Sequence, residues 1–161
     1  MVNNMPGNDI VDLIRRGGVF YNISGTGPKE VLANMIETVP AEFSVGKEAL
    51  LQAVLEREEL MPTAVGHGIA LPHPRTPLID DPAEQCIVIS FLKQAADWNA
   101  LDGQPVHTLI LIMSASPKLH LQTLSRISYL CQQEEFQALL KKRASLEEII
   151  SAVRSAETAW R

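Results

Sequence analysis

The sequence has few of the features that mark a disulfide-bonded protein. Of its 161 residues only two are cysteines, Cys86 and Cys131, and each lies within an apolar run. A cysteine within an apolar run is typically a small buried hydrophobic residue, whereas a disulfide framework needs several cysteines in an oxidising compartment. We therefore expect both cysteines to be buried and unpaired, in a protein of a reducing compartment.

The chain also lacks a basic surface. It has 14 Lys and Arg against 19 Asp and Glu, a net charge of −5, and no basic run longer than 141–143. A protein that coats DNA or RNA needs a basic face to neutralise phosphates. We therefore expect no nucleic-acid partner, and the 141–143 run is typical of a solvated helix end.

Long hydrophobic runs are missing as well. No apolar stretch approaches the about 20 residues that cross a bilayer. Residues 1–9 are polar, without the basic-then-apolar pattern of a signal peptide. The 46% hydrophobic and 20% charged residues are typical of a folded protein of one-domain size. We expect a single cytoplasmic domain over residues 1–161, with its core at about 9–155.

Hydrophobic periodicity predicts helices before and after a group of buried strands. We expect helices at 9–16, at 28–39 with Pro40 ending it, from 45 to about 57, at 117–132, at 134–142, and after a capping box at 145–148. Apolar runs predict strands at 19–23, 86–92 and 106–113, and a short strand at 68–71 inside a proline-rich loop. This order predicts an α/β fold with a central sheet covered by helices on both faces.

His73 is the first candidate for chemistry. It lies in the proline-rich loop, between Pro72 and Pro74, which favour an extended and rigid backbone. A histidine held in this way can offer one ring nitrogen as a nucleophile while a hydrogen bond orients the other. Gly66 and Gly68 can bring backbone N–H groups close to an anion. From these features alone, a loop histidine without a function remains an open interpretation.

Three further side chains each have two interpretations. His120, in the first turns of a predicted helix, is either a core histidine or a group beside an anion at the helix N-terminus. Arg57 either compensates a helix dipole or binds a phosphate with its planar fork. His107, which begins a predicted strand, is expected to be structural. A metal site built from His67, His73, His107 and His120 lacks the CxxC, HExxH or tight spacing of zinc sites.

Taken together, these residues resemble the signature of the type 2 enzyme IIA family of the bacterial phosphotransferase system, the fructose/mannitol/nitrogen-regulatory class. Its pattern, R-E…S-T-G-I-G-x-G-I-A-[IVF]-P-H, is similar to Arg57-Glu58, Thr63 and the 66–73 segment GHGIALPH. The segments LDGQPV at 101–106 and HLQTLS at 120–125 also resemble family segments. The resemblance extends from about residue 9 to the end of the chain.

The resemblance implies a mixed β-sheet between helices and a phosphohistidine carrier. His73 would accept a phosphoryl group from the phosphocarrier protein HPr, with Arg57 and His120 beside it. Thr63, Gly66, His67 and Gly68 would be possible loop contacts. Because phosphoryl transfer depends on positioning and electrostatic complement, no cofactor and no metal are expected.

Four residues depart from the family pattern around the motif. Pro62 and Ala64 stand where Ser and Gly are usual, His67 where Asn is common, and Pro74 where Gly or Ala is frequent. Pro62 removes a hydroxyl and a backbone donor, so phosphate contacts from the loop are expected to differ. His67 adds a titratable group near the motif. None of the four replaces Arg57, His73 or His120.

Two roles within the family remain as alternatives. The first is a standalone nitrogen-regulatory IIA that controls partner proteins, which the absence of a IIB or IIC segment in this sequence favours. The second is a fructose/mannitol-type IIA that passes phosphate to enzyme IIB for sugar uptake. A more remote alternative is a metal-binding or non-phosphorylated binding module.

Overall fold

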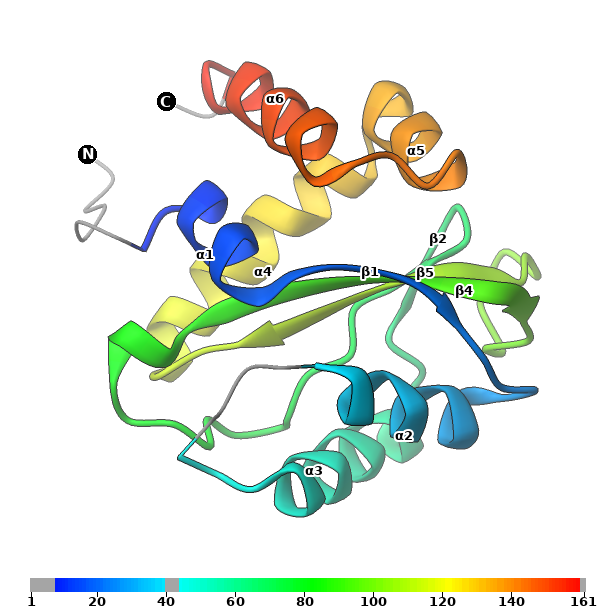
Figure 1. Ribbon diagram of the computed structural model, residues 1–161, viewed down its shortest axis with the longest axis vertical. Coiled ribbons are helices and arrows are strands. Elements are labelled where there is room, and N and C mark those ends of the chain that lie inside the picture. The colour runs from blue at the N-terminus through cyan, green and yellow to red at the C-terminus, as the bar shows by residue number, and fades with distance from the viewer. Residues whose placement is uncertain (1–7, 40–43, 160–161) are drawn as a thin grey trace.

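In the computed structural model, which describes residues 8–39 and 44–159, a five-stranded sheet lies between two layers of helices (Figure 1). The strands, in spatial order, are β1 (Gly18–Ile23), β4 (Cys86–Ala96), β5 (Val106–Met113), β3 (Ile69–Ala70) and β2 (Ala64–Gly66). β1 is parallel to β4 and β3 to β5, while β4–β5 and β2–β3 are antiparallel. The sheet is therefore mixed.

The helices divide between the two faces of the sheet. Figure 1 shows one face covered by α1 (Ile10–Gly17), α4 (Pro117–Cys131), α5 (Glu134–Lys141) and α6 (Leu146–Glu157). The other face is covered by α2 (Pro28–Thr38) and α3 (Lys47–Leu60), and a short 3-10 turn, η1 (Pro82–Glu84), precedes β4. The predicted α/β class, with a mixed sheet between helices, is confirmed.

The apolar run of β5 explains why both faces need helices. Ile110 and Ile112 belong to the core under α1, α4, α5 and α6, whereas Leu109 and Leu111 belong to the core over α2 and α3. All four side chains are fully buried. Successive side chains of a strand point to opposite faces, so a strand covered on both sides is apolar at nearly every position.

Several element boundaries differ from the prediction. α3 continues to Leu60, so Arg57 lies inside its last turn and not at its end. β4 extends to Ala96, and β2 was not predicted, since a three-residue strand carries too little pattern to detect. The capping box of α6 is present, with Ser145 and Glu148 bonding each other's backbone amides. Residues 1–7 of the polar N-terminal segment and Pro40 lie outside the described residues.

The structure also tests what the sequence predicts for the two cysteines and for membrane-spanning helices. Cys86 and Cys131 are both buried and free, as predicted, and burial raises the pKa of each thiol to about 12. Within residues 8–39 and 44–159, every helix is too short or too polar to traverse a lipid bilayer.

Gly17 ends α1 where the helix crosses β4. A Cβ at this position would collide with the backbone carbonyl of Ile87, which cannot move without disturbing the strand. We predict that Gly17→Ala lowers the free energy of unfolding by about 1–3 kcal/mol, because the helix must shift away from the sheet. The matched control is Gly46→Ala, where nothing lies within 4 Å of the added carbon. Urea unfolding checks this, and equal stability of the two variants would contradict the close crossing.

Candidate active site

Backbone hydrogen bonds anchor Leu71 and Pro72, the two residues that precede His73. The Leu71 amide donates to the Thr63 carbonyl at 3.0 Å, which ties the segment to the residue before β2. The Ile112 amide donates to the Pro72 carbonyl at 3.1 Å, which ties it to β5. The His73 backbone is therefore anchored to the sheet, although it lies in a loop.

The imidazole of His73 has one nitrogen committed and one available. Nδ1 lies 2.7 Å from the carbonyl oxygen of Leu71. Since a carbonyl oxygen only accepts hydrogen bonds, Nδ1 must carry the proton, and Nε2 then carries the lone pair. The structure thus selects the tautomer in which Nε2 is the nucleophilic atom.

Burial keeps this imidazole neutral. The side chain is only 8% exposed, and desolvation lowers the pKa of His73 from 6.5 to about 4. The Leu71 hydrogen bond opposes that change, while the positive charges of His120 and Arg57 add to it. At neutral pH the Nε2 lone pair is therefore free of a competing proton.

His120 faces His73 from the first turns of α4. The centroids of the two rings are 4.7 Å apart, with 44° between their planes. Ser116 caps the helix, its hydroxyl accepting from the Leu119 amide, and the first turn of α4 contains no acidic residue. Burial, followed by the nearby charge of Arg57, lowers the pKa of His120. Of the two interpretations of His120, the structure favours a group at a helix N-terminus beside His73.

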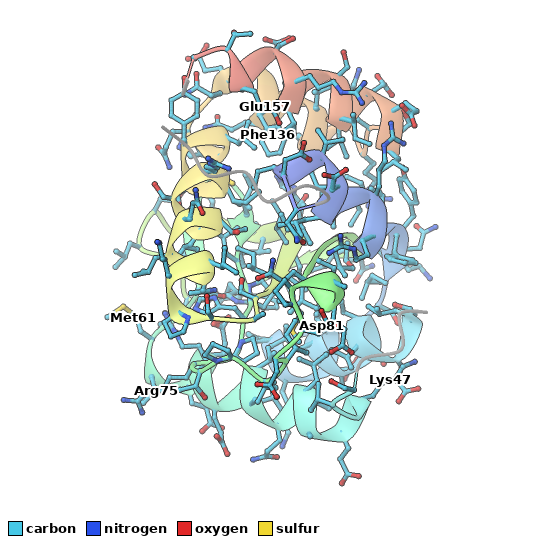
Figure 2. All side chains as sticks on the ribbon, turned by 90° about the vertical axis from the view of Figure 1, so that its left-hand side faces the viewer. Lys47, Met61, Arg75, Asp81, Phe136 and Glu157 are labelled. Carbon is cyan, nitrogen blue, oxygen red and sulfur yellow. The ribbon has the colours of Figure 1, made fainter. Side chains whose placement is uncertain are left out.

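Arg57 supplies the fixed positive charge of the site. Its Nη1 donates to the carbonyl oxygen of Met61 at 2.7 Å, which bends the side chain over the end of α3. The guanidinium lies close enough to lower the pKa of both His73 and His120. Figure 2 shows Met61, the residue that follows α3, on the same flank of the molecule as Arg75. The structure therefore brings Arg57, His73 and His120 together.

Thr63 and Glu58 form a second cluster, which is held by hydrogen bonds. The buried Thr63 donates its backbone amide to Oε2 of Glu58 at 2.7 Å and its hydroxyl to Oε1 at 3.0 Å. The indole N–H of Trp98 also donates to Oε1. In the sequence, Glu58 stands out only by its place in the motif, and Trp98 is too distant along the chain to be linked to it by pattern.

The hairpin residues Gly66, His67 and Gly68 make their contacts elsewhere. The His67 amide donates to Oδ2 of Asp102 at 2.9 Å, and the Gly68 carbonyl accepts from the His107 and Thr108 amides. His67 and Gly68 both have positive φ, as the tight turn between β2 and β3 requires. These contacts hold a turn against β5, and a phosphate contact from the three residues remains a prediction.

The described residues gather no group of three or more His, Cys, Asp or Glu side chains that could hold a metal ion. His107 lies within β5, half-buried, with Nδ1 2.7 Å from the Thr108 hydroxyl. It therefore contacts the strand and the hairpin turn.

The pKa of His73 gives a direct test of the site's electrostatics. We predict that His73 titrates with a midpoint of about 4, and that Arg57→Gln raises this pKa because it removes a positive charge beside the imidazole. Burial remains the main cause, so the variant still titrates below 6.5. NMR titration of the ring checks this, with Arg154→Gln on α6 as a control that leaves the midpoint unchanged. A parent midpoint near 6.5 would contradict the desolvated site.

Comparison with known proteins finds relatives that match most of the chain. The chain is 30% identical over 147 residues to a fructose-specific EIIABC component of the phosphotransferase system from Bacillus subtilis, matching 89% of this chain but only 23% of that relative. It is 26% identical over 159 residues to the nitrogen regulatory protein of Escherichia coli, covering 98% of this chain and 96% of the relative.

Solved structures show the same fold. The nitrogen regulatory protein IIA-Ntr from Neisseria meningitidis matches with a TM-score of 0.73 at 20% identity, over 84% of this chain and 92% of that one. The mannitol enzyme IIA from Escherichia coli, in a complex with phosphorylated enzyme IIB, matches with a TM-score of 0.67 at 19% identity, over 85% and 94%. The family model of the phosphoenolpyruvate-dependent sugar phosphotransferase system, EIIA 2, matches residues 12–156, and the chain belongs to this family.

Proposed function

We propose that His73 accepts a phosphoryl group on Nε2 from an HPr-type phosphocarrier protein and that the chain acts as a cytoplasmic phosphohistidine carrier. The observation that carries this proposal is the hydrogen bond from Nδ1 of His73 to the Leu71 carbonyl, which leaves Nε2 unprotonated. Arg57 and His120 lie close to this imidazole, which supports a role for both in stabilising the transferred group.

In the proposed step, the Nε2 lone pair attacks the phosphorus of the donor's phosphohistidine. The new P–Nε2 bond forms as the P–N bond to the donor breaks and its electron pair returns to the donor nitrogen. With a proton on its other ring nitrogen, the donor leaves as a neutral imidazole. Negative charge spreads over the three equatorial oxygens during the transfer. Arg57, a ring N–H of His120 and the N-terminus of α4 stabilise this charge without a metal ion or cofactor.

The surroundings of His73 suit contact with another protein. Leu60, Met61 and Leu121 are large apolar side chains that are each more than 60% exposed, at the end of α3 and in the first turns of α4. A groove of about 260 Å³ adjoins His120 and is lined by Pro74, Ile112 and Pro117 among others. Exposed apolar groups around a reactive side chain are typical of a docking surface.

Within the family, we propose the nitrogen-regulatory role, in which the phosphorylation state controls binding to partner proteins. The matches to nitrogen regulatory proteins support it, since the Escherichia coli relative aligns with 98% of this chain. Transfer of the phosphoryl group to an enzyme IIB for sugar uptake is the second candidate. The 30% identity to a fructose-specific EIIABC component favours this second role, and so does the likeness to a IIA in complex with IIB.

We predict that the chain gains one phosphoryl mass when incubated with phosphoenolpyruvate, enzyme I and HPr, and that His73→Ala gains none. Intact mass spectrometry checks both. The transfer depends on Nε2 of one side chain, so the loss in the variant should be complete while its circular dichroism stays that of the parent. Equal labelling of parent and variant would place the acceptor on another residue. A folded parent that takes no phosphoryl group would leave a non-phosphorylated binding module.

The two roles differ in what the phosphorylated protein does next. If the nitrogen-regulatory role holds, we predict that phosphoryl transfer from the labelled protein to purified fructose- and mannitol-type IIB domains is at least about 100-fold slower than transfer back to HPr. Radiolabel transfer measured over time checks this. Fast transfer to either IIB domain would establish the sugar-uptake role instead.

A further inference from the structure

Glu58 follows Arg57 in the sequence, but its carboxylate does not neutralise the arginine. Within the described residues no ion pair joins the two side chains: Arg57 donates to the Met61 carbonyl, whereas Glu58 accepts from Thr63 and Trp98. Adjacent residues of one helix thus have different tasks. The arginine charge is left available to an incoming anion because the neighbouring carboxylate is occupied by other donors.

The Glu58 carboxylate is the common acceptor of a small hydrogen-bonded cluster. It accepts three hydrogen bonds on two oxygens: the Thr63 amide on Oε2, and the Thr63 hydroxyl and Trp98 indole on Oε1. Trp98 is 1% exposed and Thr63 6%, so their donors have little access to water. Hydrogen bonds to an ionised acceptor are about twice as strong as neutral ones, and a buried donor without a partner is costly.

Thr63 connects this carboxylate to the reactive histidine. Its carbonyl accepts from the Leu71 amide at 3.0 Å, and the Leu71 carbonyl accepts from Nδ1 of His73 at 2.7 Å. Each link in this series is a direct hydrogen bond, and the series starts at the two carboxylate oxygens of Glu58. A displacement of Thr63 would therefore move the one carbonyl that chooses the protonated nitrogen of His73.

We propose that Glu58 is a positioning residue for His73: its two oxygens fix Thr63, and the Thr63–Leu71 backbone pair then holds the carbonyl that selects the Nδ1–H tautomer. The consequence for transfer rests on the proposed function, whereas the consequence for the tautomer does not. Glutamine cannot replace glutamate in this role, because it offers one acceptor oxygen and turns an NH2 group toward the Thr63 donors.

The test compares Glu58→Gln with Glu59→Gln. Both variants lose one carboxylate at the end of α3, but Glu59 is exposed and accepts none of these bonds, which makes it a matched control. The first readout is the tautomer of His73 in the unphosphorylated protein at neutral pH, from the 15N shifts of its ring. The second is kcat and KM for phosphoryl transfer from phosphorylated HPr.

We expect Glu58→Gln to populate the Nε2–H tautomer and to lower kcat about tenfold with KM changed less than about twofold, since the nucleophile is misplaced while docking is intact. Glu59→Gln should match the parent in both readouts. If Glu58→Gln does not fold, Thr63→Val carries the test, because it removes only the hydroxyl bond and should shift the tautomer in the same direction by a smaller amount.

Two results would overturn the proposal. One is a Glu58→Gln variant with the parent's tautomer and kcat. The other is a fall in kcat with an unchanged tautomer, which would assign Glu58 to general stability. If the parent itself accepts no phosphoryl group, the proposed function fails, but the tautomer measurement still decides the role of Glu58.

Discussion

The chemistry of the site depends on one hydrogen bond, from Nδ1 of His73 to the carbonyl oxygen of Leu71. A histidine in a loop interconverts between tautomers and is half-protonated at its ordinary pKa of 6.5. Here the carbonyl fixes the proton on Nδ1, and burial disfavours the charged ring. Together these effects leave a neutral imidazole in which Nε2, and not Nδ1, is the free ring nitrogen, which is the form that the proposed transfer requires.

The rest of the fold holds that carbonyl in place and brings Arg57 and His120 close to the imidazole. β3 is only two residues long, yet its pairing with β5 brings the chain to the sheet immediately before Leu71. Bonds to Thr63 and Ile112 extend this anchoring on both sides. α3 and α4 then contribute Arg57 and His120 from opposite faces of the sheet, so the site exists only when both helical layers have packed.

Much of this arrangement could be predicted from the sequence. The nearly continuous apolar runs of β4 and β5 predicted a sheet buried on both faces, and the Ser145–Glu148 capping box marked the start of α6. The motif around His73 and the family resemblance brought Arg57, His73 and His120 into one hypothesis, although periodicity left His120 open as a core residue. These features are local, or repeat along the chain, and so leave a pattern.

What could not be predicted are contacts between segments that carry no periodic signal. The bonds from Trp98 and Thr63 to Glu58 join residues up to 40 positions apart, and a charged pair at a helix end is usually solvated. The glycines at 66 and 68 are compatible both with a tight turn and with backbone donors to an anion. The structure shows the turn, held against Asp102 and β5, while an anion contact from these residues remains a prediction.

The central claim is that the Leu71 carbonyl makes Nε2 of His73 the atom that takes the phosphoryl group. The most direct measurement is 15N and 31P NMR of the protein phosphorylated through HPr, in which the phosphorus–nitrogen coupling identifies the bonded ring nitrogen. The account predicts phosphorus on Nε2 of His73, with the Nδ1 proton retained and bonded to Leu71. Phosphorus on Nδ1, or on His120, would contradict it.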